Sequence, residues 1–203
     1  MNSKIIITIT LFIFSFLLVK NGVYIIREND LLMKTIKEKQ TIYNIEPVNA
    51  IITKHTMIPG INGRKINLNK SYQNMKGINE FRESLLIFDE IKPSITIKGI
   101  YNKVIISGNP AINKVSILTK LDDKYCYTED LTIKKECIQS NKYTILIYKI
   151  TNNHLSKTKD NLSNGKIFYL DNINNNELNL IIKYLKNNNY VIVDIDNLIF
   201  FDI

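Results

Sequence analysis

The strongest hydrophobic pattern of the chain is an apolar run near its beginning. Residues 5–19 are apolar or Thr/Ser without a charge, and the apolar character resumes at 23–26. As a helix, Ile5 to Ile26 would be roughly 33 Å long, enough to cross a bilayer. The run predicts an uncleaved N-terminal membrane anchor. A cleaved signal peptide and a buried helix are the alternatives, and Lys-Asn-Gly after Val19 is no small-x-small cleavage site.

The middle of the chain mixes helical and extended patterns. Residues 29–40 and 66–78 predict short helices, with Asn29 or Asp30 capping the first. The stretch 57–63 contains Pro-Gly and Asn-Gly and predicts turns. Two β-branched runs, 94–98 and 103–107, predict a hairpin because a turn separates them.

From residue 111 the pattern alternates between strands and helices. Leu178, Ile181, Ile182 and Leu185 follow the i, i+3, i+4, i+7 spacing of an amphipathic helix over 175–187. Strand–helix–strand order favours a right-handed crossover and a parallel pair. Apolar runs predict strands over 115–118, 143–150, 166–170 and 190–195. We therefore predict three regions: an anchor (1–27), a mixed α+β region (28–110) and an α/β region (111–203).

Composition narrows the classes of function. The 203 residues carry a net charge of +8, but there is no basic run or Arg cluster, so no nucleic-acid partner is expected. The two histidines, His55 and His154, lie far apart, and no HxxxH or HExxH spacing occurs. No metal site is therefore predicted from the histidines, and both are expected to be ordinary surface residues.

Candidate chemistry rests on a few acids and two cysteines. Asp122 and Asp123 follow the predicted strand 115–118, and Asp171 ends another; carboxylates at strand ends can bind a metal or act as a base. They are weak candidates, because each suits a solvated turn or a cap equally well. Cys126 and Cys137 are a disulfide candidate if the domain lies in an oxidising compartment.

A family resemblance lies in the order of several segments. It covers about residues 30–200, in MIPGINGRKINLNKSYQNMK, FRESLLIFDEIKPSITI, NKVIISGN, KVSILTKLDD, KYCYTE, YTILIYKI, NLSNGKIFYLD and ELNLIIKYLKNNNYVIVDIDNLI. These segments resemble the membrane-anchored, polysaccharide deacetylase-like proteins of low-GC Gram-positive bacteria, with the central catalytic portion missing between Asp123 and Lys124. The resemblance implies a distorted (β/α) barrel and zinc-assisted removal of acetyl groups from N-acetylated glycans.

The resemblance extends to the scaffold but not to the catalytic residues. Lys120 and Leu121 stand where the family has paired Asp residues, and the HxxxH segment is absent. Asp171 stands where the family has its acid His. The expected fold class is thus α/β, a small, incomplete (β/α)-barrel-like parallel sheet preceded by a mixed α+β N-terminal region and a transmembrane helix.

The leading functional hypothesis is a non-catalytic relative in the cell membrane, single-pass, with most of the chain extracytoplasmic. Its expected partners are the membrane and cell-wall glycan or another membrane protein, with no cofactor and no metal; a remnant without a role is also open. The first alternative is an active N-acetylglucosamine deacetylase using zinc with Asp122, Asp123, Asp171 and a histidine. The second is an unrelated anchored interaction module.

Overall fold

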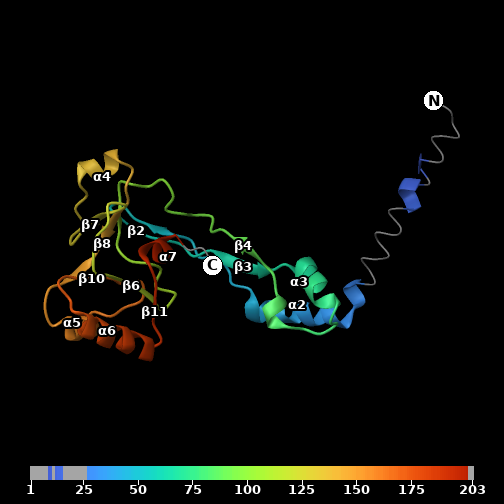
Figure 1. The fold of residues 1–203 in the computed structure, drawn as a ribbon. Coiled ribbons are helices and arrows are strands. Elements are labelled where there is room, and N and C mark those ends of the chain that lie inside the picture. Colours follow the sequence, from blue (N-terminus) through green and yellow to red (C-terminus); the bar gives the residue numbers. More distant parts are fainter. Residues whose placement is uncertain (1–8, 11, 16–26, 201–203) are drawn as a thin grey trace. The chain divides into compact units, whose positions relative to one another are not determined.

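The computed structural model describes residues 9–10, 12–15 and 27–200 (Figure 1). Their contacts divide the chain into two units. The first contains the described residues up to Ile45 together with Arg64–Glu90, and the second contains Glu46–Gly63 and the chain from Ile91 onward. The chain thus changes unit after residues 45, 63 and 90, whereas the sequence suggested regions meeting at 27/28 and 110/111.

The first unit packs two helices against each other. Helix α2 (Leu31–Tyr43) begins at Asp30, whose carboxylate accepts the Leu32 N–H at 2.8 Å. Helix α3 (Leu68–Lys76) begins at Asn67 in the same way, through the Lys70 N–H. Their shared core includes Met33, Ile36 and Met75, all fully buried. The unit also contains a 3-10 turn, Glu83–Leu85, and most of a two-stranded sheet of β3 (Gly63–Ile66) and β4 (Phe88–Ile91), whose end residues Gly63 and Ile91 belong to the second unit.

The second unit contains a five-stranded sheet. Its order is β1-β2-β5-β8-β7, and every pair is parallel except β1 with β2. The predicted hairpin of 94–98 with 103–107 is wrong: residues 94–98 form no strand, and Val104 pairs in parallel with Thr56 and Thr144. The bounds are β1 Ile51–Ile52, β2 Thr56–Ile58, β5 Val104–Ile105, β7 Cys126–Thr128 and β8 Thr144–Leu146.

A four-stranded parallel sheet completes the second unit. Its order is β11-β6-β10-β9, with bounds β6 Lys114–Leu118, β9 Tyr148–Ile150, β10 Ile167–Leu170 and β11 Val191–Ile192. Only Ile147 separates β8 from β9, so the run predicted as one strand over 143–150 passes from one sheet into the other. The parallel sheets agree with the predicted α/β class.

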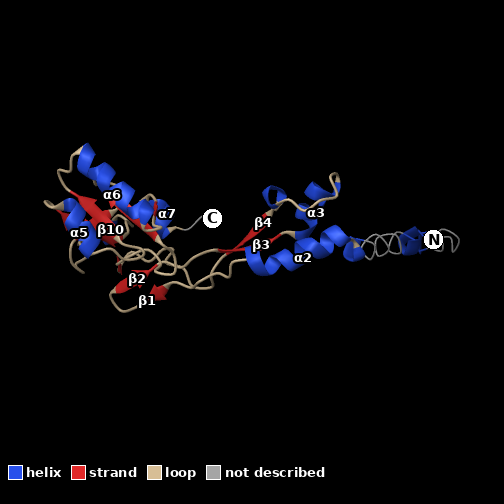
Figure 2. Cartoon of the chain, turned by 90° about the horizontal axis from the view of Figure 1, so that it is seen from below, coloured by secondary structure: helices blue, strands red, loops and turns tan. Residues whose placement is uncertain are grey.

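Helices cover the four-stranded sheet on one face. Helices α5 (His154–Asp160) and α6 (Asn175–Asn187) lie there (Figure 2), and Ile181 and Leu185 of α6 are buried with Phe168 and Leu170. The side chain of Ile167 instead joins the main core with residues of the five-stranded sheet and of α7 (Ile195–Ile199). The short helix α4 (Lys135–Gln139) follows β7.

Helix α7 packs directly against the backbone at Gly108, which has no side chain. A Cβ on Gly108 would come within 2.6 Å of the Leu198 side chain, so only glycine allows this approach. Gly108 in turn donates its N–H to the carbonyl of Gly165 at 2.8 Å. The C-terminal end of α7 is thereby fixed beside the start of the four-stranded sheet.

The predicted membrane anchor does not find support. Within residues 9–10, 12–15 and 27–200, no helix combines the length and the apolar character needed to cross a membrane. This finding contradicts the predicted single-pass location in the cell membrane. The apolar run at 5–26, on which that prediction rested, lies largely outside the described residues.

Candidate functional site

Acidic residues gather at the carboxyl edge of the four-stranded sheet. Its parallel strands end at the same edge, which is where open α/β sheets bind ligands. Asp122 and Asp123 come after β6, Asp171 follows β10 directly, and Asp194 and Asp196 come after β11. This edge is therefore the candidate location of a ligand-binding or catalytic site.

Asp122 and Asp196 form one cluster with a lysine and two tyrosines. Lys124 Nζ donates to both carboxylate oxygens of Asp196, at 2.6 and 2.7 Å, and the Tyr125 hydroxyl donates to the same carboxylate. Asp122 accepts the Lys124 backbone N–H at 3.0 Å and the Tyr127 hydroxyl at 3.2 Å. The cluster thus joins the loop after β6, strand β7 and helix α7.

Its hydrogen bonds make Asp196 a poor candidate for a general base. Hydrogen bonds from Lys124 and then Tyr125 lower the pKa of Asp196, which makes it a weaker base than an ordinary aspartate. Burial, followed by the bond to Asp196, raises the pKa of Tyr125. Burial, followed by the charge of Asp122, raises the pKa of Tyr127. Both phenols therefore stay protonated and act as hydrogen-bond donors.

Asp171 belongs to a different cluster on β9, β10, α5 and α6. Its carboxylate lies 3.5 Å from Lys149 Nζ, and its carbonyl accepts a hydrogen bond from His154 Nε2 at 2.9 Å. The other ring nitrogen, Nδ1, lies 3.1 Å from Glu177 Oε2. His154 is only 5% exposed, so the expectation of a surface histidine is wrong for it, while His55 is exposed.

These residues do not fit the zinc that the family resemblance implies. Both ring nitrogens of His154 already have partners within the protein, and a histidine ligand needs a free nitrogen lone pair. Asp123 is exposed and makes no hydrogen bond or ion pair to another described residue. In the part of the chain that the structure describes, no three His, Cys, Asp or Glu side chains are grouped to hold a metal ion.

A cleft opens beside the first cluster, between β7 and α4. This β7–α4 cleft has a volume of about 530 Å³, and its walls include Leu121, Tyr125, Tyr127 and both cysteines. A disulfide joins Cys126 of β7 to Cys137 of α4, with the two Cα atoms 6.1 Å apart. The bond fixes the two walls of the cleft relative to each other. Further polar residues of the lining are Thr128, Asp130, Thr132, Lys134 and Glu136.

One buried hydroxyl of the cleft lacks a partner. Thr144 of β8 lines the cleft and is 2% exposed, and its Oγ1 makes no hydrogen bond to any described residue. Leaving such a group unpaired costs about 1–3 kcal/mol. This hydroxyl has almost no exposed surface, so it belongs to the packed interior beneath the cleft.

Sequence reasoning found part of this arrangement. It singled out Asp122, Asp123 and Asp171, but the structure separates Asp122 from Asp171 into two clusters and leaves Asp123 in solvent. It missed Lys124, Tyr125 and Thr144 as site residues. Lys124 and Tyr125 bond to Asp196, which lies 72 and 71 positions further along the chain. Local sequence patterns do not predict contacts between residues so far apart.

The comparisons with known proteins begin with solved structures of the same fold. Three crystal structures of BA3943, described as a CE4 family pseudoenzyme, match 83% of this chain at TM-scores of 0.61–0.62 and 16–17% identity. One is the wild-type protein from Bacillus anthracis, and one is a mutant with restored enzymatic activity. The matches cover 94–97% of those chains. At this identity they establish the fold.

One curated relative matches at the level of sequence. The uncharacterized protein YlxY of Bacillus subtilis (strain 168) is 35% identical over 100 residues, which are 49% of this chain. The chain spans only 31% of the length of that relative. No protein-family model matches.

These matches define the class of fold, that of the CE4 or polysaccharide deacetylase proteins. The deacetylase-like fold expected from the sequence is supported, and pseudoenzyme neighbours agree with the prediction that leaned toward a non-enzyme. Neither the predicted loss of a central portion nor membrane anchoring is shown by them.

Proposed function

We propose that this chain is a non-catalytic protein of the polysaccharide deacetylase-like class that binds a cell-wall glycan in the β7–α4 cleft. The observation that carries the proposal is a cleft lined by two tyrosines and by the threonines Thr128, Thr132 and Thr144. The likeness of the fold to CE4 pseudoenzymes supports the non-catalytic part.

The chemistry of the cleft suits a molecule rich in hydroxyl groups. Its volume of about 530 Å³ lies within the usual range for small-molecule sites. Tyr125 and Tyr127 offer an apolar ring with a polar tip, and Thr128 and Thr132 add hydroxyl groups, of which that of Thr128 already donates to Asp130. Asp130 adds a carboxylate acceptor, and hydrogen bonds from Thr132 lower its pKa, so it is ionised at neutral pH. Sugar rings carry complementary donors, acceptors and apolar faces.

The state of the acids supports binding without catalysis. Amide hydrolysis needs an activated water, a base for it and an acid for the leaving amine. Asp196 has a lowered pKa because of Lys124, and His154 has partners at both ring nitrogens. The zinc-dependent alternative would need ligands that the described residues do not bring together.

The disulfide agrees with a partner in the cell wall. Such bonds persist in oxidising environments and are rare where thiols are kept reduced. Both cysteines lie in the walls of the cleft, so the bond holds these walls in place before a ligand arrives. Less conformational entropy is then lost on binding.

The test is calorimetric titration of the purified chain with N-acetylglucosamine oligomers, together with an acetate-release assay with added zinc. Thr144→Val removes the unpaired hydroxyl with little change of shape. Thr158→Val is the matched control, because Thr158 is also buried with an unpaired hydroxyl but lies on α5. We expect saturable binding, weakened roughly 2- to 10-fold by Thr144→Val, the worth of one hydrogen bond.

Two outcomes would overturn the proposal. Absence of saturable binding, or equal weakening by both threonine substitutions, would refute the assignment of the glycan to this cleft. Zinc-dependent release of acetate would refute the non-catalytic part and favour the enzyme.

A further inference from the structure

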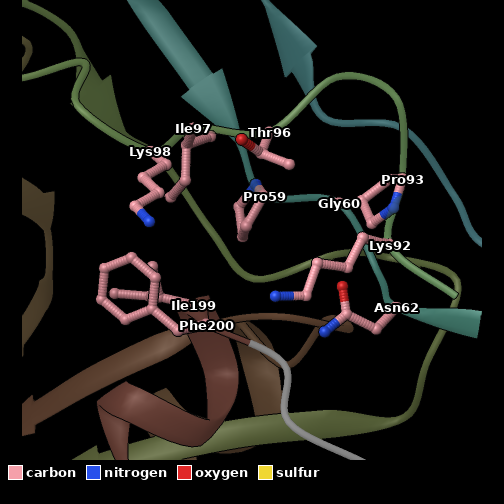
Figure 3. Close-up of a pocket in the computed structure, with 10 residues that line it drawn as sticks. All are labelled: Pro59, Gly60, Asn62, Lys92, Pro93, Thr96, Ile97, Lys98, Ile199 and Phe200. Carbon is pink, nitrogen blue, oxygen red and sulfur yellow. The ribbon is translucent and has the colours of Figure 1, made fainter. Parts of the chain in front are cut away.

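A second pocket of the same unit lies at the opposite end of α7 from Asp196. Ile199 and Phe200 form one side of it, and the turn at Pro59 and Gly60 after β2 forms another (Figure 3). The segment 92–98 forms a third side, and the volume of the pocket is about 320 Å³. None of its lining residues belongs to the β7–α4 cleft or to the Asp122 and Asp171 clusters, so its chemistry is independent of the proposed function. We call it the lysine pocket.

The charge in the lysine pocket is of one sign. Lys92 and Lys98 belong to its lining, and the described residues of that lining include no Asp or Glu. Their ammonium groups are directed toward the interior of the pocket (Figure 3). Neither lysine has a carboxylate within ion-pair distance among the described residues, whereas Lys124 and Lys149 do. Two ammonium groups that face one pocket, with no counter-charge from any residue that the structure describes, attract an anion.

The rest of the lining is apolar or neutral. Ile97 and Ile199 are buried beneath the pocket, and the Phe200 side chain remains 37% exposed. The Phe200 ring is supported from behind by Tyr143, at 5.2 Å between ring centroids. Asn62 and Thr96 add neutral polar groups at the rim. Apolar walls around a few polar groups are the common composition of small-molecule sites.

We propose that the lysine pocket binds an organic oxyanion, a carboxylate or phosphate carried on an apolar or aromatic group. The oxyanion is held by the ammonium groups of Lys92 and Lys98, and the apolar part lies against Ile199 and Phe200. Lysine acts as a point charge, so it accepts carboxylate and phosphate alike. The apolar wall distinguishes such a ligand from a bare inorganic ion.

The test is calorimetric titration of the purified chain with four probes: phenyl phosphate, benzoate, inorganic phosphate and neutral benzyl alcohol. We expect saturable binding of phenyl phosphate, benzoate or both, and the stronger of the two identifies the oxyanion. Inorganic phosphate and benzyl alcohol should each bind at least 10-fold more weakly, because each lacks one half of the ligand. Binding should also weaken as salt rises.

Charge variants locate the site. The double variant Lys92→Gln/Lys98→Gln should weaken binding at least 10-fold, and Lys92→Arg/Lys98→Arg should restore most of it. Lys183→Gln is the matched control, because Lys183 is an exposed lysine of α6 far from the lining in sequence and outside it in space. The three substituted lysines are all exposed, so the variants should fold, and thermal unfolding of each variant checks this.

The proposal is overturned if no organic anion binds saturably, or if Lys183→Gln weakens binding as much as the double variant. The first result would make the pocket an empty surface feature, and the second would mean that only the overall positive charge attracts anions. Equal binding of benzyl alcohol and phenyl phosphate would refute the role of the lysines. None of these outcomes bears on glycan binding at Thr144.

Discussion

Reduction of the Cys126–Cys137 disulfide should destabilise the second unit by about 3 kcal/mol at 25 °C, the chain-entropy cost of a loop closed over 11 positions. Because the disulfide lies within the second unit, this loss of stability should be confined to that unit. Strand β7 is three residues long and lies at the end of its sheet, paired only with β8. The disulfide is its covalent link to α4, where Cys137 is buried.

The assay is urea unfolding of the purified chain, with and without dithiothreitol, followed by amide NMR signals. Ile145 reports on the second unit and Ile36 on the first, and both are fully buried. Reduction should lower the free energy of unfolding measured at Ile145 and leave that at Ile36 unchanged. Cys126→Ala/Cys137→Ala is the control, because its unfolding should be insensitive to dithiothreitol.

Two results would refute this reasoning. A loss below about 1 kcal/mol at Ile145 would mean that the loop is already ordered in the unfolded chain or strained in the folded one, contrary to the entropic account. An equal loss at Ile36 would mean that the two units do not unfold separately.

Three further substitutions test the packing, the electrostatics and the caps. Leu185→Ala should cost about 2–5 kcal/mol in urea unfolding, because this side chain is fully buried, while Leu180→Ala on the same helix, 54% exposed, should cost less than about 0.5 kcal/mol. The hydrogen bonds of Lys124 lower the pKa of Asp196 below 3.8; the stability they give is complete above the unfolded value and is lost as pH falls through the lower folded value. Lys124→Gln should raise the pKa of Asp196 in a carboxyl-carbon NMR titration, and an unchanged midpoint would contradict the pairing. Asn67→Ala should lower the stability of the first unit by about 1 kcal/mol, measured as the unfolding of the amide signals of α3, because it removes the cap of that helix; an unchanged value would show that the cap is replaceable.

Local patterns predicted the helices well. The spacing of apolar residues predicted a helix over 175–187, and α6 spans the same residues with Ile181 and Leu185 buried. The helix predicted over 66–78 is α3, Leu68–Lys76, with Asn67 and Gly77 as its flanking residues. Helical bonds join residues four apart, so the sequence within one segment contains the information.

Strand partners were not predictable in the same way. The β-branched runs at 94–98 and 103–107 look like a hairpin, but Val104 finds its partners at Thr56 and Thr144. The strand over 143–150 was recognised, yet its passage between two sheets at Ile147 depends on what lies beside each half. Pairing over such distances is decided by the assembled core, which a single segment does not encode.

In the candidate site, too, local features were predictable and long-range contacts were not. Acids at strand ends were visible in the sequence, because a strand end is a local feature. Their partners were not: Asp196 meets Lys124 and Tyr125 only because β7 and α7 converge. Thr144 gave no signal at all, since a threonine in an apolar strand is ordinary and its unpaired hydroxyl is a property of the packed structure.

The hydrogen bonds of Asp122 and Asp196 bear on whether deacetylase activity could be introduced into this chain. One neighbouring structure is described as a pseudoenzyme mutant with restored activity, so a fold of this kind tolerates such a change in that protein. Here, an Asp placed at Lys120 or Leu121 would add one carboxylate, but a catalytic zinc needs three protein ligands. Asp122 and Asp196 already accept hydrogen bonds that join the loop after β6 to β7 and α7. Recruiting them to a metal would break those bonds and leave the hydroxyl of the buried Tyr125 without its acceptor. A single substitution should therefore yield neither zinc binding nor acetate release, and either result from one substitution would show that these acids are more available than their hydrogen bonds indicate.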